Sequence, residues 1–240
     1  MKYRMIYDLH THTVFSHGKG TIEDNVKAAV EKGLETIGIA DHGPGHLTYG
    51  VKRENFPVMR KEIERLKPLY PQIQLKLCVE ANIMNPSGRL DTGKEEERWL
   101  DAVLAGYHYG IFGEAPVRAL FLHGGNLLRL GACKKANTER VLKALYENKI
   151  EILTHPGDKG VFDIEPIARA CAERGTLMEI STWHKALTVE DIRICAKTQA
   201  EFVISSDAHT PERVGTFEEG LARALEAGLD PARIVNIREI

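Results

Sequence analysis

The chain has little cysteine, and its cysteines form no recognisable pattern. The 240 residues include four cysteines with no CxxC pair and no disulfide-like spacing, at Cys78, Cys133, Cys171 and Cys195. Scattered thiols of this kind are typical of reduced, buried side chains, which excludes a disulfide scaffold and favours a cytoplasmic protein. Cys78 stands two residues before Glu80 and could face the same side of a strand, but packing is favoured over a metal role.

Long apolar runs and an excess of one charge are also missing. No apolar run approaches the roughly 18 residues that indicate a membrane span, and the N-terminus lacks the pattern of a signal peptide. The 32 basic and 34 acidic residues give a formal net charge of -2, so duplex nucleic acid is not expected as a partner. We expect a cytoplasmic protein without membrane association, and the sequence leaves its oligomeric state open.

Alternating strand and helix patterns are what the chain does have. Strands that are apolar on both faces are separated by helical patterns over residues 21–32, 57–70, 138–148, 164–174, 189–199 and 217–227. Such strands pair in parallel through helical crossovers. About seven units predict an α/β fold, a distorted seven-stranded (β/α)7 TIM-like barrel in a single domain over residues 1–240. An open doubly wound sheet is the alternative. The irregular residues 110–136 are expected to form an extra helix or a lid.

Nearly every predicted strand ends in a residue type that binds metal ions. These residues are His10 and His12, Asp41 and His42, Glu80, His108, His155, Glu179 and His184, and Asp207 and His209. Closure into a barrel would bring the ends of all strands around one point, which favours the barrel over the open sheet. A carboxylate can bridge two ions, and ligation rich in imidazole suits Zn, Mn or Fe. The pattern predicts a site for two to three divalent metal ions.

Four residues of ligand type are not expected to bind metal themselves. His46, His123 and His184 are expected to be core or loop histidines. Glu179 is expected to pair with a helix or with a histidine outside the ligand set.

The same segments resemble the motifs of the PHP (polymerase and histidinol phosphatase) family. The matching stretches, in chain order, are DLHTHTVFSHG, GIADHG, CVEAN, AGYHYG, LTHPG and SSDAH. The resemblance covers almost the whole chain and is to a free-standing phosphoesterase, not to the PHP domain of a polymerase. It implies the distorted seven-stranded barrel and a trinuclear metal site.

The resemblance also implies a set of ligands for each ion. The first ion would be held by His10, His12, Glu80 and Asp207, the second by Glu80, His108 and His155, and the third by His17, His42 and His209. All nine ligand types of the family are present, which argues against a non-catalytic metal-binding module.

The predicted activity is metal-dependent hydrolysis of a small phosphomonoester, in which a metal-bound hydroxide attacks phosphorus in line. Asp41, beside a ligand, is a candidate for orienting a histidine or transferring a proton, with a helix or loop cap as the alternative. Arg118 and Arg213 are preferred as phosphate anchors over Lys19 and Lys159. The alternative functions are an exonuclease-type phosphodiesterase on nucleic-acid ends and a histidinol-phosphate phosphatase. Amidohydrolase chemistry would call for a bridging lysine that no strand end supplies.

Overall fold

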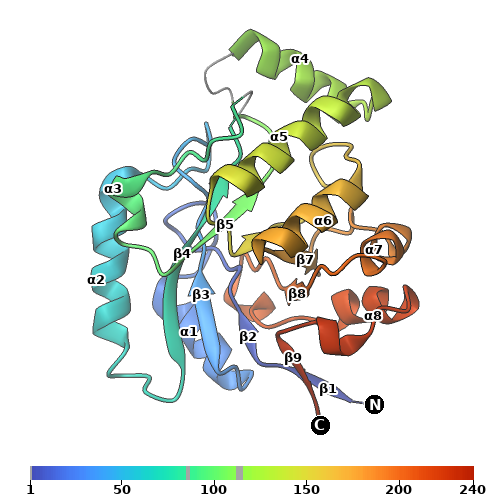
Figure 1. Cartoon of the computed structure of the whole chain (residues 1–240). Coiled ribbons are helices and arrows are strands. Elements are labelled where there is room, and N and C mark those ends of the chain that lie inside the picture. Colours follow the sequence, from blue (N-terminus) through green and yellow to red (C-terminus); the bar gives the residue numbers. More distant parts are fainter. Residues whose placement is uncertain (1, 85–86, 112–115) are drawn as a thin grey trace.

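A parallel sheet of seven strands curls into a nearly closed barrel in the computed structural model, which describes residues 2–84, 87–111 and 116–240 (Figure 1). Every neighbouring pair of strands is parallel, and the order in the sheet follows the chain. The strands are β2 (Tyr7–Asp8), β3 (Thr36–Ile39), β4 (Gln74–Asn82), β5 (Ala102–Gly106), β6 (Ile152–Leu153), β7 (Leu177–Ser181) and β8 (Phe202–Ser205). The predicted seven-stranded barrel is confirmed, and the open doubly wound sheet is not found.

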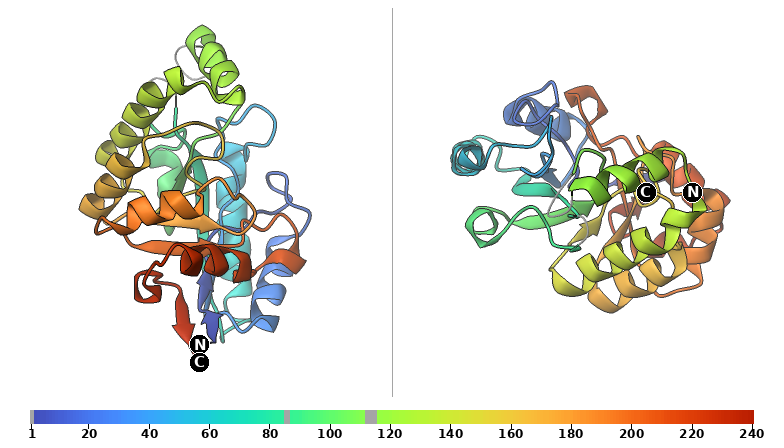
Figure 2. Two further views of the ribbon diagram at one scale, coloured as in Figure 1. Left: turned by 90° about the vertical axis from the view of Figure 1, so that its right-hand side faces the viewer. Right: turned by 90° about the horizontal axis from the view of Figure 1, so that it is seen from above.

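Helices surround the strands on the outside (Figures 1 and 2). They are α1 (Ile22–Glu31), α2 (Phe56–Leu66), α3 (Lys94–Glu97), α4 (Pro116–Leu127), α5 (Lys134–Glu147), α6 (Ile164–Arg174), α7 (Val189–Ala196) and α8 (Glu218–Glu226). Capping boxes begin α1 and α7, where the side chains of Thr21 and Thr188 accept from the backbone N–H of Asp24 and Asp191. The predicted helix 57–70 is too long, since α2 ends at Leu66 and Pro68 has no backbone N–H with which to continue the helical hydrogen bonds.

A backbone bridge and side-chain hydrogen bonds close the seam between β2 and β8. Thr11 bridges Ala208 just beyond the two strands. Lower down, the side-chain amide of Asn236 donates to Tyr7 O at 2.8 Å and to Ile204 O at 2.6 Å, and its oxygen accepts from Ile204 N at 3.0 Å. Asn236 therefore supplies the hydrogen bonds that a direct strand pair would have made. β1 (Tyr3–Met5) and β9 (Ile237–Glu239) form an antiparallel pair beside the termini.

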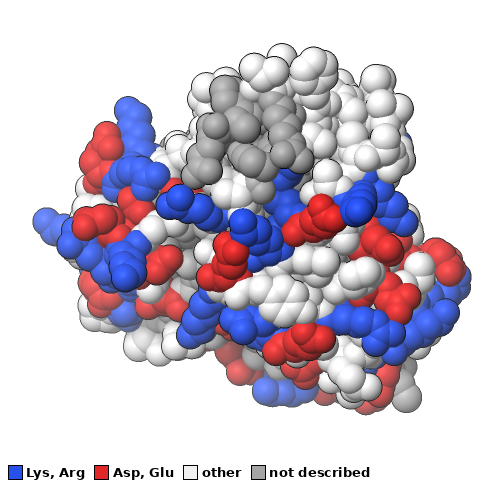
Figure 3. Space-filling view, turned by 45° about the horizontal axis from the view of Figure 1, so that its top comes forward, with Lys and Arg blue, Asp and Glu red and all other residues white. Residues whose placement is uncertain are grey.

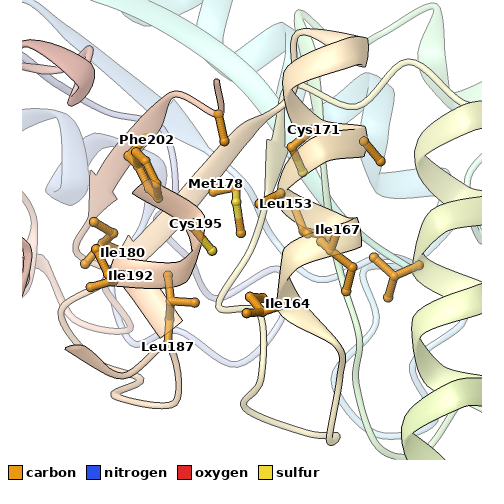
Figure 4. Close-up of a cluster of buried hydrophobic side chains, with 14 of the residues drawn as sticks. Leu153, Ile164, Ile167, Cys171, Met178, Ile180, Leu187, Ile192, Cys195 and Phe202 are labelled. Atoms are coloured by element: carbon orange, nitrogen blue, oxygen red, sulfur yellow. The ribbon is translucent and has the colours of Figure 1, made fainter. Parts of the chain in front are cut away.

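Alternate residues of the strands pack on opposite sides of the barrel wall. Figure 4 shows Leu153, Met178 and Phe202 of β6, β7 and β8 against apolar side chains of α6 and α7. The neighbouring residues Ile152 and Val203 belong to a separate small cluster with Cys78, on the other side of the wall. The barrel interior is thus apolar below the level of Glu80. Cys78 packs in this interior, and burial raises the pKa of its thiol to about 12.

The irregular segment 110–136 contains the expected extra helix. α4 stands at the top of the molecule, away from the barrel wall (Figures 1 and 2). Asn126 attaches it to the body, since the buried amide donates to Tyr107 Oη at 2.9 Å. Residues 112–115 of the predicted lid lie outside the described residues. No described helix is long and apolar enough to cross a membrane.

Candidate metal centre

Glu80 lies at the middle of a cluster of histidines at the C-terminal end of the barrel. The side chain is fully buried, and its Oε1 is 2.7 Å from His155 Nε2 and 3.1 Å from His108 Nε2. Its Oε2 is 2.8 Å from His42 Nδ1 and 3.4 Å from His10 Nε2. One carboxylate therefore faces imidazoles from four other segments with both of its oxygens, which is the arrangement that a bridging ligand needs.

A second carboxylate, Asp207, completes a group with His10 and His12. Asp207 Oδ1 is 3.1 Å from His12 Nε2 and 3.6 Å from His10 Nε2, and the two Nε2 atoms are 3.1 Å apart. The ligand atoms of His10, His12 and Glu80 lie within 4.8 Å of one another, and so do those of His10, His155 and Asp207. These are groups from which a single ion could be reached by three or four ligands.

Two further histidine groups flank Glu80. On one side, the Nε2 atoms of His108 and His155 are 3.4 Å apart. On the other side, the rings of His17 and His209 have centroids 4.3 Å apart, and those of His17 and His42 are 4.8 Å apart. His42 also reaches Glu80, so it lies between the second and third of the predicted groups.

Buried polar atoms at this centre lack hydrogen-bond partners among the described residues. They are His12 Nδ1, His42 Nδ1, Glu80 Oε2 and Asp207 Oδ2. Glu80 Oε2 and His42 Nδ1 lie close together but without hydrogen-bond geometry. A buried polar atom left without a partner costs about 1–3 kcal/mol, so this many in one place indicates that another group supplies the contact. Imidazole nitrogens and carboxylate oxygens together suit Zn, Mn and Fe, so the residues fit the divalent ions that the resemblance implies.

Residues behind the ligands hold the imidazoles so that Nε2 faces the centre. The last residue of β4, Asn82, has its Oδ1 2.7 Å from His108 Nδ1. Glu179 Oε1 is 2.7 Å from His10 Nδ1, and its Oε2 accepts a hydrogen bond from His155 N at 2.6 Å. Such partners orient metal-binding imidazoles and raise their basicity. Glu179 therefore contacts two proposed ligands, not the helix or the histidine outside the ligand set that the sequence predicts, and Asn82 carries no sequence signal.

The backbone around the ligands is strained or tightly packed. His155 and Asp207 have φ values of 27° and 50°, in the left-handed region that non-glycine residues rarely occupy. A Cβ on Gly106 would lie 2.5 Å from His108 Cε1 and 2.9 Å from Glu80 Oε1. Glycine is therefore required at position 106 for these two ligands to approach each other.

The charges in the cluster hold both carboxylates ionised. Burial raises the pKa of Glu80, but His108 and His10 outweigh it and the pKa lies well below its usual value. Burial also raises the pKa of Asp207, and the same pKa is brought well below its usual value by His10 and His12. Burial lowers the pKa of His12 far below its usual value. Burial also lowers the pKa of His10, but Glu179 and Asp207 outweigh it and that pKa lies well above its usual value. Ionised carboxylates and neutral imidazoles are the forms that bind metal, so an ion at this centre would displace the proton of His10.

Asp41 does not point at a ligand. Its carboxylate accepts hydrogen bonds from Thr13 N at 2.7 Å, Thr13 Oγ1 at 2.6 Å and Ser16 Oγ at 2.5 Å. These bonds engage both oxygens with the loop that joins His12 to His17. The contacts therefore favour the loop cap over the orienting or proton-transferring role, and Asp41 acts on the ligands through the backbone.

The two arginines predicted to anchor the phosphate are not found among the described residues of the pocket wall. Arg118 belongs to α4, but its side chain is outside the described part of the structure. The Arg213 guanidinium stacks on the Trp183 ring, 4.5 Å from the centroid, and Arg213 is not among the described residues that line the pocket. Lys159, which the sequence analysis ranks lower, does line the pocket, with Nζ 2.5 Å from Asp158 Oδ2.

A pocket of about 430 Å³ opens above the ligands. Two histidines that sequence reasoning assigns to loops or core, His46 and His184, belong to its wall. His184 Nε2 is 3.3 Å from Asp207 Oδ2, and its Nδ1 is 3.1 Å from Asp158 Oδ2. The signal for His184 is its position after a predicted strand, as for the ligands, whereas nothing in the sequence singles out Asp158.

A parallel α/β barrel with histidines and carboxylates gathered at the ends of its strands defines the class of this protein. The family model for the PHP domain matches residues 8–182. The chain therefore belongs to the PHP domain family.

Relatives match over nearly the whole length. A protein of Shewanella baltica (strain OS195) named "Probable phosphatase" is 30% identical over 251 residues, covering 98% of this chain and 87% of the relative. One with the same designation from Thermoanaerobacter sp. (strain X514) is 29% identical over 248 residues, covering 97% and 91%. The crystal structure of histidinol phosphate phosphatase from Lactococcus lactis subsp. lactis, complexed with zinc, L-histidinol and phosphate, has a TM-score of 0.64 at 15% identity and covers 94% of this chain and 95% of that one. This last likeness shows the shared fold.

Proposed function

We propose that this chain is a metal-dependent phosphatase that hydrolyses small phosphomonoesters at a centre of two to three divalent ions. Both oxygens of Glu80 face imidazoles from separate strand ends, and this observation carries the proposal. Membership of the PHP family and relatives named as phosphatases support hydrolysis of phosphoric esters. The nine ligands are His10, His12, His17, His42, Glu80, His108, His155, Asp207 and His209.

The reaction requires a phosphate group bound at the centre and a water molecule positioned next to its phosphorus atom. Hydrolysis adds one water, breaks the ester bond at phosphorus and releases an alcohol and inorganic phosphate. Divalent ions at the centre would bind phosphate oxygens and lower the pKa of a water. The protein orients the ligands through Glu179 and Asn82, whose side chains contact His10 and His108. Lys159, on the pocket wall, is the cation that we assign to the phosphate, ahead of Arg213.

The size of the pocket favours a small substrate. About 430 Å³ falls within the range of small-molecule sites. On the face that Figure 3 shows, Lys and Arg side chains are interspersed with Asp and Glu, and they form no continuous positive track of the kind that a polynucleotide backbone follows. A phosphomonoester is therefore preferred over an end of a nucleic acid.

The experiment is a screen of metal-loaded protein against phosphomonoesters, histidinol phosphate and short single-stranded oligonucleotides. We expect release of inorganic phosphate from at least one small monoester, and its loss in His10→Ala and Asp207→Ala. His123→Ala is the matched control, because His123 is not among the described residues of the pocket wall. Turnover of oligonucleotides alone, or full activity in both ligand variants, would refute the proposal.

A further inference from the structure

Trp183 is a large aromatic side chain left open at the mouth of the pocket. It lies just after β7, and 49% of its surface is exposed although it lines the pocket. Its ring centroid is 6.2 Å from that of His209, a proposed ligand. An apolar ring in this position would meet the part of a substrate that is joined to the phosphate, not the phosphate itself.

The Arg213 guanidinium stacks on the Trp183 indole. Its guanidinium carbon is 4.5 Å from the Trp183 centroid, and its Nε has no hydrogen-bond partner among the described residues. Because Trp183 lines the pocket and Arg213 is absent from the described lining, we place the guanidinium on the side of the ring away from the pocket. A cation on one face of an indole restrains the ring at little cost in packing.

Tyr49, a second exposed ring at the mouth, already contacts neighbouring rings, and the part-exposed Tyr109 of the pocket wall packs edge-on against His123. Tyr49, 44% exposed, stacks on His17 at 4.4 Å and on His46 at 4.6 Å. Tyr49 thus serves to support histidines of the pocket wall, whereas Trp183 has an indole surface that the described part of the structure leaves available. Trp183 therefore leaves more ring surface open to a substrate than Tyr49 does.

We infer that Trp183, backed by Arg213, is a stacking platform for a planar, π-bearing leaving group, so that the preferred substrates are phosphomonoesters of aryl-containing alcohols or of other flat ring systems. This inference rests on the proposed function for the phosphate end of the substrate. Stacking of an aromatic ring on indole adds about 0.5–1.5 kcal/mol beyond the area that it buries, which corresponds to roughly 2- to 13-fold in affinity.

The test compares two ligands that differ in one ring, which is planar and aromatic in the first and saturated in the second. Dissociation constants of 2-phenylethylphosphonate and 2-cyclohexylethylphosphonate, which cannot be hydrolysed at the P–C bond by this chemistry, are measured by calorimetry on metal-loaded protein. Hydrolysis of the corresponding phosphate esters is followed in parallel. We expect the phenyl compound to bind roughly 3- to 10-fold more tightly, Trp183→Ala to bring the ratio close to one, and Trp183→Phe to retain most of it.

The matched control is Tyr146→Ala, which removes an equally exposed ring on α5. It should leave the ratio unchanged. Equal affinities in the wild type, or an unchanged ratio in Trp183→Ala, would overturn the inference while leaving phosphatase activity intact. Selective binding without turnover of any phosphoester would instead support the platform and contradict the proposed function.

Discussion

Two buried polar clusters lie along the same seam of the barrel, and they differ in how completely their atoms are paired. At the lower cluster, Asp8 Oδ2 accepts hydrogen bonds from Ser206 Oγ at 2.5 Å and Gly215 N at 3.0 Å. Its Oδ1 accepts from His10 N at 3.3 Å. At the upper cluster, Glu80 Oε2 and Asp207 Oδ2 have no hydrogen-bond partner among the described residues.

This difference in hydrogen-bond pairing distinguishes a cluster that stabilises the fold from one that binds a ligand. Burying a carboxylate costs free energy, and Asp8 offsets this cost with donors that the fold itself provides. Glu80 and Asp207 face other acceptors and imidazoles, an arrangement that the protein alone leaves incomplete. Unpaired buried atoms that converge on one point therefore indicate a ligand more reliably than burial or charge alone.

The largest expected effect comes from the bridging carboxylate of the unpaired cluster. Glu80→Gln removes the charge that faces four histidines, so kcat/KM should fall about 1,000-fold or more, with loss of bound metal. Steady-state kinetics and elemental analysis measure both. Near-normal activity with a normal metal content would show that the carboxylate is not a ligand.

Gly106→Ala tests the crowding around the same carboxylate without removing a ligand. The new Cβ would displace His108 and Glu80, and a shift of about 1 Å in catalytic groups costs on the order of 100-fold in rate. Kinetics of metal-loaded protein measure the loss. Gly131→Ala is the control, because no atom lies within 4 Å of the added Cβ. Equal rates for the two variants would argue against close approach at Gly106.

The hydrogen bonds of Asn236 form a second fully paired group at the same seam, and a change there should appear in stability. Asn236→Ala leaves Tyr7 O and both backbone groups of Ile204 unpaired at the seam, so the free energy of unfolding should fall by about 2–3 kcal/mol. Urea unfolding measures it, with bound metal per folded protein expected to stay the same. Asn148→Ala, which removes one bond to Ala144 O, should cost about 1 kcal/mol. A lower metal content per folded protein in Asn236→Ala would contradict the distinction between a structural group and the metal centre.

The smallest expected effect comes from Glu179, which connects to the centre through His10 and His155. Glu179→Gln keeps the shape and removes the charge, so metal affinity should fall about 10-fold, and Glu179→Ala should lower it further. Competition with a chelator measures both variants. Identical affinities in wild type and Glu179→Ala would show that the contact does not support the ligands.

The sequence predicted the elements whose signals are local. The barrel strands with ligand-type residues at their ends, and the helices that begin at capping boxes, follow from patterns within about ten residues. The closure at Asn236 and the contact between Asp158 and His184 could not be predicted, because they join segments that meet only after the barrel forms. The choice between two roles for Asp41 stayed open for the same reason, since its partners Thr13 and Ser16 lie across the fold.

The most direct test of the central claim is the metal content of the purified protein, measured by plasma mass spectrometry after supply of Zn, Mn and Fe in turn. The account predicts two to three equivalents of divalent metal per chain, and at most a small fraction of this in Glu80→Gln. Less than one equivalent with every metal, or the same content in Glu80→Gln, would contradict a polynuclear centre built around Glu80.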